Sequence, residues 1–206
     1  LAAKGVRFTQ AYATAPVCAP NRSCVISGVF AATLGSNNMR SGGEGSKASR
    51  PPVPPADLQF LPEVLCTQGY YCTNNSKEDY NLSIEKQIWS EKSSPKAHWR
   101  NRPNPDQPFF AVFNFTGTHE SQIRAEQRDF DLVTKALKKS ERRNPDAVRV
   151  PPYHADTPTT RRQWANYHEL ITALDYWVAD LLKQLDEDGL AENTIVIFWS
   201  DHGVGL

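Results

Sequence analysis

Cys18 and Arg22 are the first residues whose types and spacing could carry chemistry. They lie in the segment Cys18-Ala19-Pro20-Asn21-Arg22, where Pro20 suits the first turn of a helix because no N–H is needed there. A cysteine just before a helix start lies where backbone N–H groups and the helix dipole favour an anion. Arg22 adds a planar donor for a tetrahedral oxyanion. A buried cysteine beside a proline-initiated helix would explain the same residues without any chemistry.

Four further residues could act on such an anion. Asp201 and His202 follow an apolar β-branched run, and a carboxylate and an imidazole at a strand end are reasonable metal ligands or acid–base groups. His119 also follows an apolar run, and Lys77 lies in a polar segment. An ordinary Asp-His-Gly turn, a surface histidine and a solvated lysine are the alternatives without chemistry.

A long amphipathic helix is the strongest element that the sequence predicts. Apolar side chains recur at alternating steps of three and four residues, which is the period of one helix face. Asp156 or Thr157 can cap its start and Gly189 can end it. The residues of this face are Trp164, Tyr167, Ile171, Leu174, Val178, Leu181 and Leu185.

Shorter elements precede and follow this helix. Strands are predicted at 5–12, 70–73, 109–115 and 194–198, and the run 109–115 is apolar on both faces, as in a central strand. Apolar residues within 31–57 follow neither a helical nor an alternating spacing, so this segment is expected to form a loop. Three short helices are also predicted, one opened by Pro20 with Val25, Ile26 and Val29 buried, one opened by Pro62 with Leu61, Val64 and Leu65 buried, and one around Leu132, Ala136 and Leu137.

Helices that alternate with buried strands predict an α/β layered sheet. In such sheets ligands bind outside the carboxyl ends of the strands, which is where His119, Asp201 and His202 are expected.

Composition excludes several classes of protein. The chain has 206 residues with 23 basic and 23 acidic side chains, a balance that argues against a nucleic-acid-binding protein. No apolar run approaches the length of a membrane span. The four cysteines form two pairs with a spacing of six residues and contain no C-x-x-C motif, which argues against a zinc knuckle or a redox dithiol. A chain of this length does not need disulfides for stability.

The order of the candidate motifs resembles that of the type I sulfatases. C-x-P-x-R is followed by G-Y-Y-x-T-N-N-x-K, by an apolar strand ending in T-H, by the long helix, and by N-T-I-V-I-F-x-S-D-H-G. The similarity runs from Val6 to Gly203 and is nearest to a bacterial branch that includes heparan N-sulfatase-like enzymes. It implies the alkaline-phosphatase-like core, a mixed and largely parallel sheet sandwiched by helices.

The resemblance also implies a role for each candidate residue. Cys18 would be oxidised by a separate maturation enzyme to formylglycine (3-oxoalanine), whose hydrated aldehyde is the nucleophile. Arg22 would hold the formylglycine and the sulfate, and Lys77 would bind a sulfate oxygen. His119 would contact the sulfate or protonate the leaving group. Arg40 is a further candidate for binding the anionic substrate.

A divalent cation is the second implied cofactor. Asp201 and His202, together with residue 18, would ligate a metal ion, usually calcium, that polarises the sulfuryl oxygens. Calcium prefers oxygen ligands, so the imidazole leaves magnesium, manganese and zinc open.

Several departures from the family pattern matter, among them Ser27 where Thr is commoner and His202 at a position that is often Asn. Asn21 stands where most sulfatases carry Ser, Thr or Ala, and Asp79 stands where many carry a histidine. The family's first metal-binding strand, its smaller C-terminal domain and a further lysine would lie outside residues 1–206. We therefore expect the chain to be an internal piece, a partial catalytic domain that is incomplete at both ends and inactive alone.

The resemblance predicts hydrolysis of sulfate esters or sulfamates on sulfated glycans by a periplasmic or secreted enzyme. One alternative is a phosphomonoester or phosphodiester hydrolase of the same superfamily, which would use Ser, Thr or unmodified Cys with zinc. The other is a catalytically inactive relative that only binds sulfated glycans.

Overall fold

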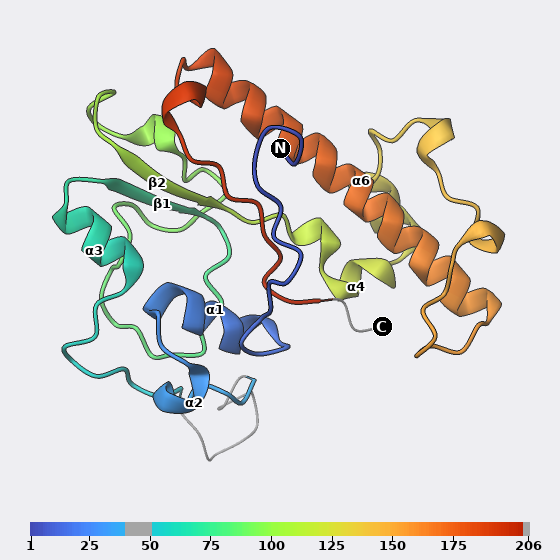
Figure 1. Cartoon of the computed structure of the whole chain (residues 1–206), viewed down its shortest axis with the longest axis horizontal. Helices are drawn as coiled ribbons and strands as arrows, with labels where there is room; N and C mark the ends of the chain where they lie inside the picture. Colours follow the sequence, from blue (N-terminus) through green and yellow to red (C-terminus); the bar gives the residue numbers. More distant parts are fainter. Residues whose placement is uncertain (40–50, 204–206) are drawn as a thin grey trace. The chain divides into compact units, whose positions relative to one another are not determined.

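The computed structural model describes residues 1–39 and 51–203 and has an α/β fold (Figure 1). The chain forms two compact units. Leu1–Asn114 and Trp199–Gly203 make the first unit, and Phe115–Phe198 make the second. Each unit has hydrophobic clusters of its own. None of the helices in the described ranges is long and apolar enough to span a membrane.

A two-stranded parallel sheet forms the centre of the first unit. Strand β1 (Tyr71–Asn75) pairs with strand β2 (Phe109–Phe113), with Tyr71 opposite Phe109 and Asn75 opposite Phe113. Because the strands are parallel, the polar residues that follow them emerge at the same end of the sheet. Lys77 follows β1, and Asn114 follows β2.

Three helices accompany this sheet in the first unit. They are α1 (Cys18–Ser27), α2 (Ala31–Leu34) and α3 (Leu61–Thr67). Helix α1 ends at Gly28 in the left-handed conformation (φ 70°), and α3 opens with the Glu63 carboxylate accepting the Phe60 N–H at 2.9 Å. Helix α3 lies against β1 (Figure 1). The buried core of this unit comprises Ile26, Leu34, Phe60, Cys72, Leu82, Ile88 and Trp89.

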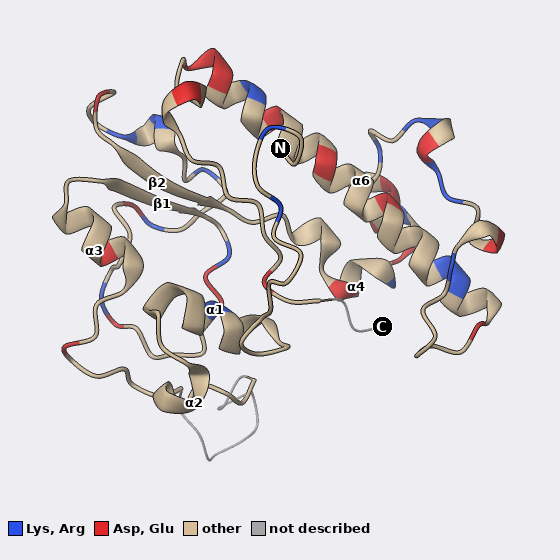
Figure 2. Cartoon of the chain, in the orientation of Figure 1, with Lys and Arg blue, Asp and Glu red and all other residues tan. Residues whose placement is uncertain are grey.

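The second unit is built on one long helix. Helix α6 (Pro158–Glu187) contacts α4 (Glu120–Ile123), and α4 contacts α5 (Gln127–Val133). Acidic and basic residues are interspersed along α6 (Figure 2). Leu170 on this helix is fully buried in a cluster with Ile123 and Phe130. Short 3₁₀ turns at Trp99–Asn101, Thr116–Thr118, Lys139–Glu141, Pro145–Ala147 and Ala191–Asn193 complete the regular structure of the described residues.

The prediction of an α/β fold with parallel strands is confirmed, and so is the long helix. The Thr157 hydroxyl caps α6 by accepting the Thr160 N–H at 3.1 Å, and Gly189 has the left-handed conformation (φ 71°) that ends the helix. The strands predicted at 70–73 and 109–115 are present as β1 and β2. All five residues of β2 are half-buried, whereas the three central residues of β1 are buried.

The strands predicted at 5–12 and 194–198 are wrong. Neither segment pairs with another strand in the part of the chain that the structure describes, and their large apolar side chains are exposed, with Phe8 at 81% and Ile195 at 89%. Alternating or β-branched residues favour a strand, but a strand also needs a neighbour for its backbone groups. The sequence pattern shows the propensity for a strand, but it does not show whether a neighbouring strand is present.

Three smaller predictions also need correction. Pro20 lies in the first turn of α1 as predicted, but the helix already includes Cys18, which was expected just before its start, and Val25 on it is 46% exposed. The segment expected to be a loop contains α2. On α3, Leu65 packs against the core, whereas Leu61 and Val64 are 41% and 40% exposed. Folded proteins keep much apolar surface exposed, and short helices on the surface contribute part of it.

Candidate active site

Cys18 is the first residue of α1 and lies almost completely buried, with 5% of its surface exposed. Val17 precedes it in an extended conformation and serves as the N-cap, so the thiol lies at the helix N-terminus. Burial raises the pKa of the Cys18 thiol, and the Asp79 carboxylate raises this pKa further by its hydrogen bond and its charge. The Lys77 ammonium opposes this effect. Cys18 therefore lies within the influence of both Lys77 and Asp79.

Arg22 lies one turn further along α1 and braces the loop after β1. Its Nε donates to the Glu78 carbonyl at 2.9 Å, and its Nη2 donates to the Lys77 carbonyl. The same nitrogen donates to the Asn114 Oδ1 at 2.9 Å. The Arg22 side chain is only 9% exposed, so this guanidinium fork fixes the Lys77 segment from within the unit.

The loop that carries Lys77 has an uncommon backbone conformation. Ser76 and Asp79 have positive φ angles of 73° and 46° although neither is glycine. Such conformations persist where surrounding contacts over-determine them, and the two Arg22 bonds supply such contacts. The Lys77 Nζ lies 3.6 Å from the Asp79 Oδ2, which keeps the ammonium close to the cysteine.

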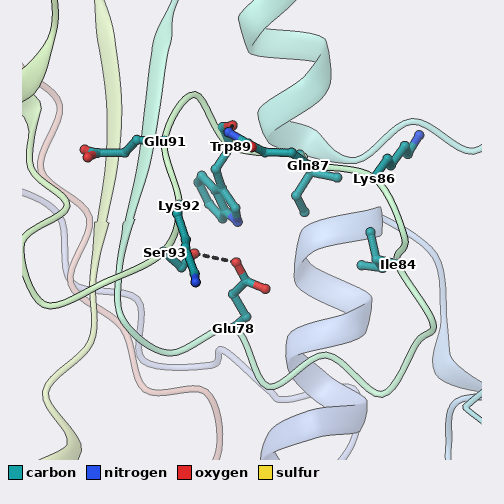
Figure 3. Close-up of a pocket in the computed structure, with 9 residues that line it drawn as sticks. Glu78, Ile84, Lys86, Gln87, Trp89, Glu91, Lys92 and Ser93 are labelled. Atoms are coloured by element: carbon teal, nitrogen blue, oxygen red, sulfur yellow. Dashed lines mark hydrogen bonds between the residues drawn. The ribbon is translucent and has the colours of Figure 1, made fainter.

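A cavity of about 320 Å³ adjoins the same loop on the Glu78 side (Figure 3). Lys86, Trp89 and Lys92 line it, and the Glu78 carboxylate accepts a hydrogen bond from the Ser93 hydroxyl. The side chain of Glu78 is thus anchored in the cavity wall while its carbonyl is held by Arg22. Both ends of this residue help to fix the loop.

Asp201 and His202 lie next to α1. The Arg22 Nη1 is 3.9 Å from the Asp201 Oδ2, and the Asp201 carbonyl accepts a hydrogen bond from the Asn21 side chain. The His202 Nδ1 lies 2.6 Å from the Gly203 carbonyl, and its Nε2 lies 3.9 Å from the Asp201 Oδ1. A neutral imidazole that donates from Nδ1 leaves Nε2 with a lone pair for a ligand.

The metal-binding prediction rests on these two donors. A carboxylate oxygen and an imidazole nitrogen that converge in this way fit two positions of a divalent-cation shell. No group of three or more histidine, cysteine, aspartate or glutamate side chains suited to a metal occurs within residues 1–39 and 51–203. The donors present therefore fit part of a metal shell.

Two predicted site residues lie outside the described part of the first unit. His119 belongs to the second unit, where it is exposed and caps α4. Its Nδ1 lies 2.9 Å from the Ser121 Oγ and accepts the Ser121 N–H at 3.3 Å. Arg40 lies outside the described residues.

Three polar residues that sequence reasoning did not assign to the site support it. The Asn21 Oδ1 accepts the Thr14 N–H and hydroxyl at 3.0 and 2.7 Å, while its amide nitrogen reaches Asp201. The Asn114 amide nitrogen donates to Asn74 Oδ1 and the Asn75 carbonyl at 2.9 and 3.0 Å. Asp79 was visible in the sequence only as a departure from a family pattern. The one signal in the sequence that could have assigned these residues to the site is their closeness along the chain to Cys18, to Lys77 and to the end of β2.

These contacts place a cysteine at a helix N-terminus beside a lysine and an arginine in an α/β fold, which is an arrangement suited to an anion. The chain belongs to the sulfatase family, whose model matches residues 1–82 and 71–206.

Named relatives agree with this family. An ulvan-active sulfatase of Formosa agariphila is 37% identical over 98% of this chain and 38% of its own length. The N-acetylgalactosamine-6-sulfatase of Homo sapiens is 24% identical over the whole of this chain and 44% of its own length. The chain thus spans about two fifths of the length of these two relatives.

Proposed function

We propose that the full-length protein hydrolyses sulfate esters or sulfamates on sulfated glycans, with residue 18 as the nucleophile in its formylglycine form. The observation that carries the proposal is the meeting of Cys18, Lys77 and the Arg22 fork within one unit.

Each residue has a proposed task in this reaction. A formylglycine at position 18 supplies a hydrated aldehyde as the attacking group. Lys77 binds a sulfate oxygen through its ammonium, and Arg22 holds the Lys77 segment in place through two carbonyl bonds. Asp79 keeps the ammonium near residue 18. His119 protonates the leaving group or contacts the sulfate.

Asp201 and His202 are proposed to ligate a divalent cation, most simply calcium, with residue 18 completing the contact to the metal. Such an ion polarises sulfuryl oxygens. The Gly203 carbonyl orients the imidazole so that Nε2 is the ligating atom, and the Arg22 Nη1 lies 3.9 Å from the Asp201 carboxylate.

The substrate class rests on two supports. The site offers Lys77 and Arg22 to an anion while the chain as a whole has no net charge, so attraction is local. The names of the relatives mention ulvan and N-acetylgalactosamine 6-sulfate chemistry, which favours a sulfated carbohydrate. Arg40 is a candidate contact to that substrate. A formylglycine-generating enzyme is the proposed maturation partner, and a periplasmic or secreted location is proposed.

The test combines mass and activity on the full-length protein, co-expressed with a maturation enzyme. The peptide containing residue 18 should be about 18 Da lighter than the cysteine form, and the protein should release sulfate from a panel of sulfated mono- and disaccharides. Cys18→Ala should abolish release, whereas Cys24→Ala, a buried cysteine of the same helix, should retain it.

Two results would reject the proposal. Full activity with an unchanged Cys18 mass and a preference for phosphate esters would establish the phosphatase alternative. Binding of sulfated saccharides without release from any of them, equal in Cys18→Ala, would establish the inactive binding relative.

A further inference from the structure

Cys66 and Cys72 meet where α3 turns back into β1. The helix ends in a tight reversal in which the Gly69 N–H donates to the Cys66 carbonyl at 3.0 Å and the Tyr70 N–H donates to the Leu65 carbonyl at 3.1 Å. Gly69 takes a φ of 86°, which a side chain would disfavour. The reversal brings β1 back against α3, and the Cys72 thiol in β1 forms a hydrogen bond with the Cys66 thiol in the last turn of α3.

Ser90 contacts both cysteines. Its hydroxyl lies 3.5 Å from the Cys66 sulfur and accepts the Cys72 N–H at 2.9 Å. Cys72 is fully buried, whereas Cys66 is half-buried and packs against the same core cluster. Burial raises the pKa of the Cys72 thiol, and a hydrogen bond with the Cys66 thiol raises it further. Cys66 is thus the accessible member of the pair and Cys72 the protected one.

We propose that Cys66 and Cys72 are a dithiol–disulfide pair, a modification site that joins the end of α3 to the start of β1. The oxidant is a small or protein disulfide. The Cys66 thiolate attacks one of its sulfur atoms and releases the first thiol, which gives a mixed disulfide. Cys72 loses its proton and attacks the Cys66 sulfur, and the second thiol leaves. Two protein thiols are oxidised, and one external disulfide is reduced to two thiols.

The other two cysteines lack such a geometry. Cys18 faces Asp79 and Lys77, and Cys24 is buried within α1. The pairing Cys66–Cys72 is therefore specific. Its consequence is mechanical, since β1 leads directly into the loop of Lys77, and the bond would tie the start of that strand to α3.

The test uses the full-length protein, incubated either with oxidised glutathione or with a reductant, and then alkylated. Cleavage after Glu63 and Glu78 leaves both cysteines on one peptide. After oxidation this peptide should be about 2 Da lighter than the dithiol and should resist alkylation. Alkylation of both residues after oxidation, or a stable glutathione adduct on Cys66, would overturn the proposal.

Variants separate the bond from other effects of oxidation. The oxidised protein should melt about 5 °C above the reduced one. Cys66→Ser should melt at the same temperature in both conditions, and Cys24→Ala should keep the difference. A redox-dependent shift that persists in Cys66→Ser would contradict the assignment. Sulfatase activity is not required for any of these measurements, so the proposal stands or fails independently of the proposed function.

Discussion

At the scale of single residues, Arg22 is the clearest case in which side-chain shape and not only charge matters. Its fork holds two consecutive carbonyls, those of Lys77 and Glu78, and an Asn114 oxygen. Arg22→Lys keeps the charge but cannot donate to all three acceptors. We expect a loss of about 1–3 kcal/mol in the free energy of unfolding, because buried carbonyls would lose their donors.

The same change tests the proposed function. Misplacement of Lys77 should lower kcat/KM on a sulfated saccharide about a hundredfold. Arg102→Lys is the matched control, since Arg102 also forks onto backbone carbonyls, those of Trp99 and Pro105, away from Cys18. An Arg22→Lys enzyme with unchanged stability and kcat/KM would show that the fork does not position Lys77.

Residue-scale prediction from the sequence worked where spacing along one element decides the geometry. Cys18 and Arg22 are four residues apart on one helix, so their shared neighbourhood follows from the helical repeat. Asn21 and Asn114 act on residues far away in the sequence, and no periodicity reports such partners. The left-handed backbone at Asp79 depends on contacts around the loop and was equally invisible.

At the scale of elements, α6 shows how much a cap contributes to a helix that the sequence predicts well. The Thr157 hydroxyl accepts the Thr160 N–H at the first turn. Thr157→Ala should therefore lower the free energy of unfolding by about 1 kcal/mol, as measured by urea unfolding. Thr159→Ala is the control on the same turn, and equal losses in both variants would argue against a capping role.

Helices and strands differ in what the sequence can predict about them. Helix α6 satisfies its own backbone groups, so the apolar period and its caps were sufficient evidence. The segment 194–198 has the composition of a buried strand, yet it forms no ladder among the described residues, and Ile195 and Ile197 are exposed. A strand depends on a second segment, and one-dimensional patterns do not contain that partner.

At the scale of the whole molecule, the balance of charge and the burial of titratable groups set how stability depends on pH. The 23 acidic and 23 basic residues cancel at neutral pH. Burial raises the pKa of the Cys72 thiol and of the Tyr80 hydroxyl above their ordinary values of 9.0 and 10.0. Both groups are therefore protonated in the folded chain at pH values where the unfolded chain has begun to lose these protons.

The sign of the effect follows from this difference. Stability from the two neutral groups is fully present below about pH 9 and is lost as the pH rises, because the unfolded state binds fewer protons. In the reduced protein we expect the free energy of unfolding to fall by about 3 kcal/mol between about pH 8 and about pH 10.5. Urea unfolding followed by tryptophan fluorescence, with a reductant present, measures this fall.

Two comparisons assign the fall to these groups. Tyr80→Phe should flatten the dependence above about pH 10, whereas Tyr153→Phe, at an exposed position, should leave it unchanged. Oxidation of the Cys66–Cys72 pair should flatten the pH dependence of the free energy of unfolding from about pH 9, because a disulfide carries no titrating thiol. Equal slopes in the reduced, oxidised and Tyr80→Phe proteins would mean that burial of these two groups does not govern alkaline stability.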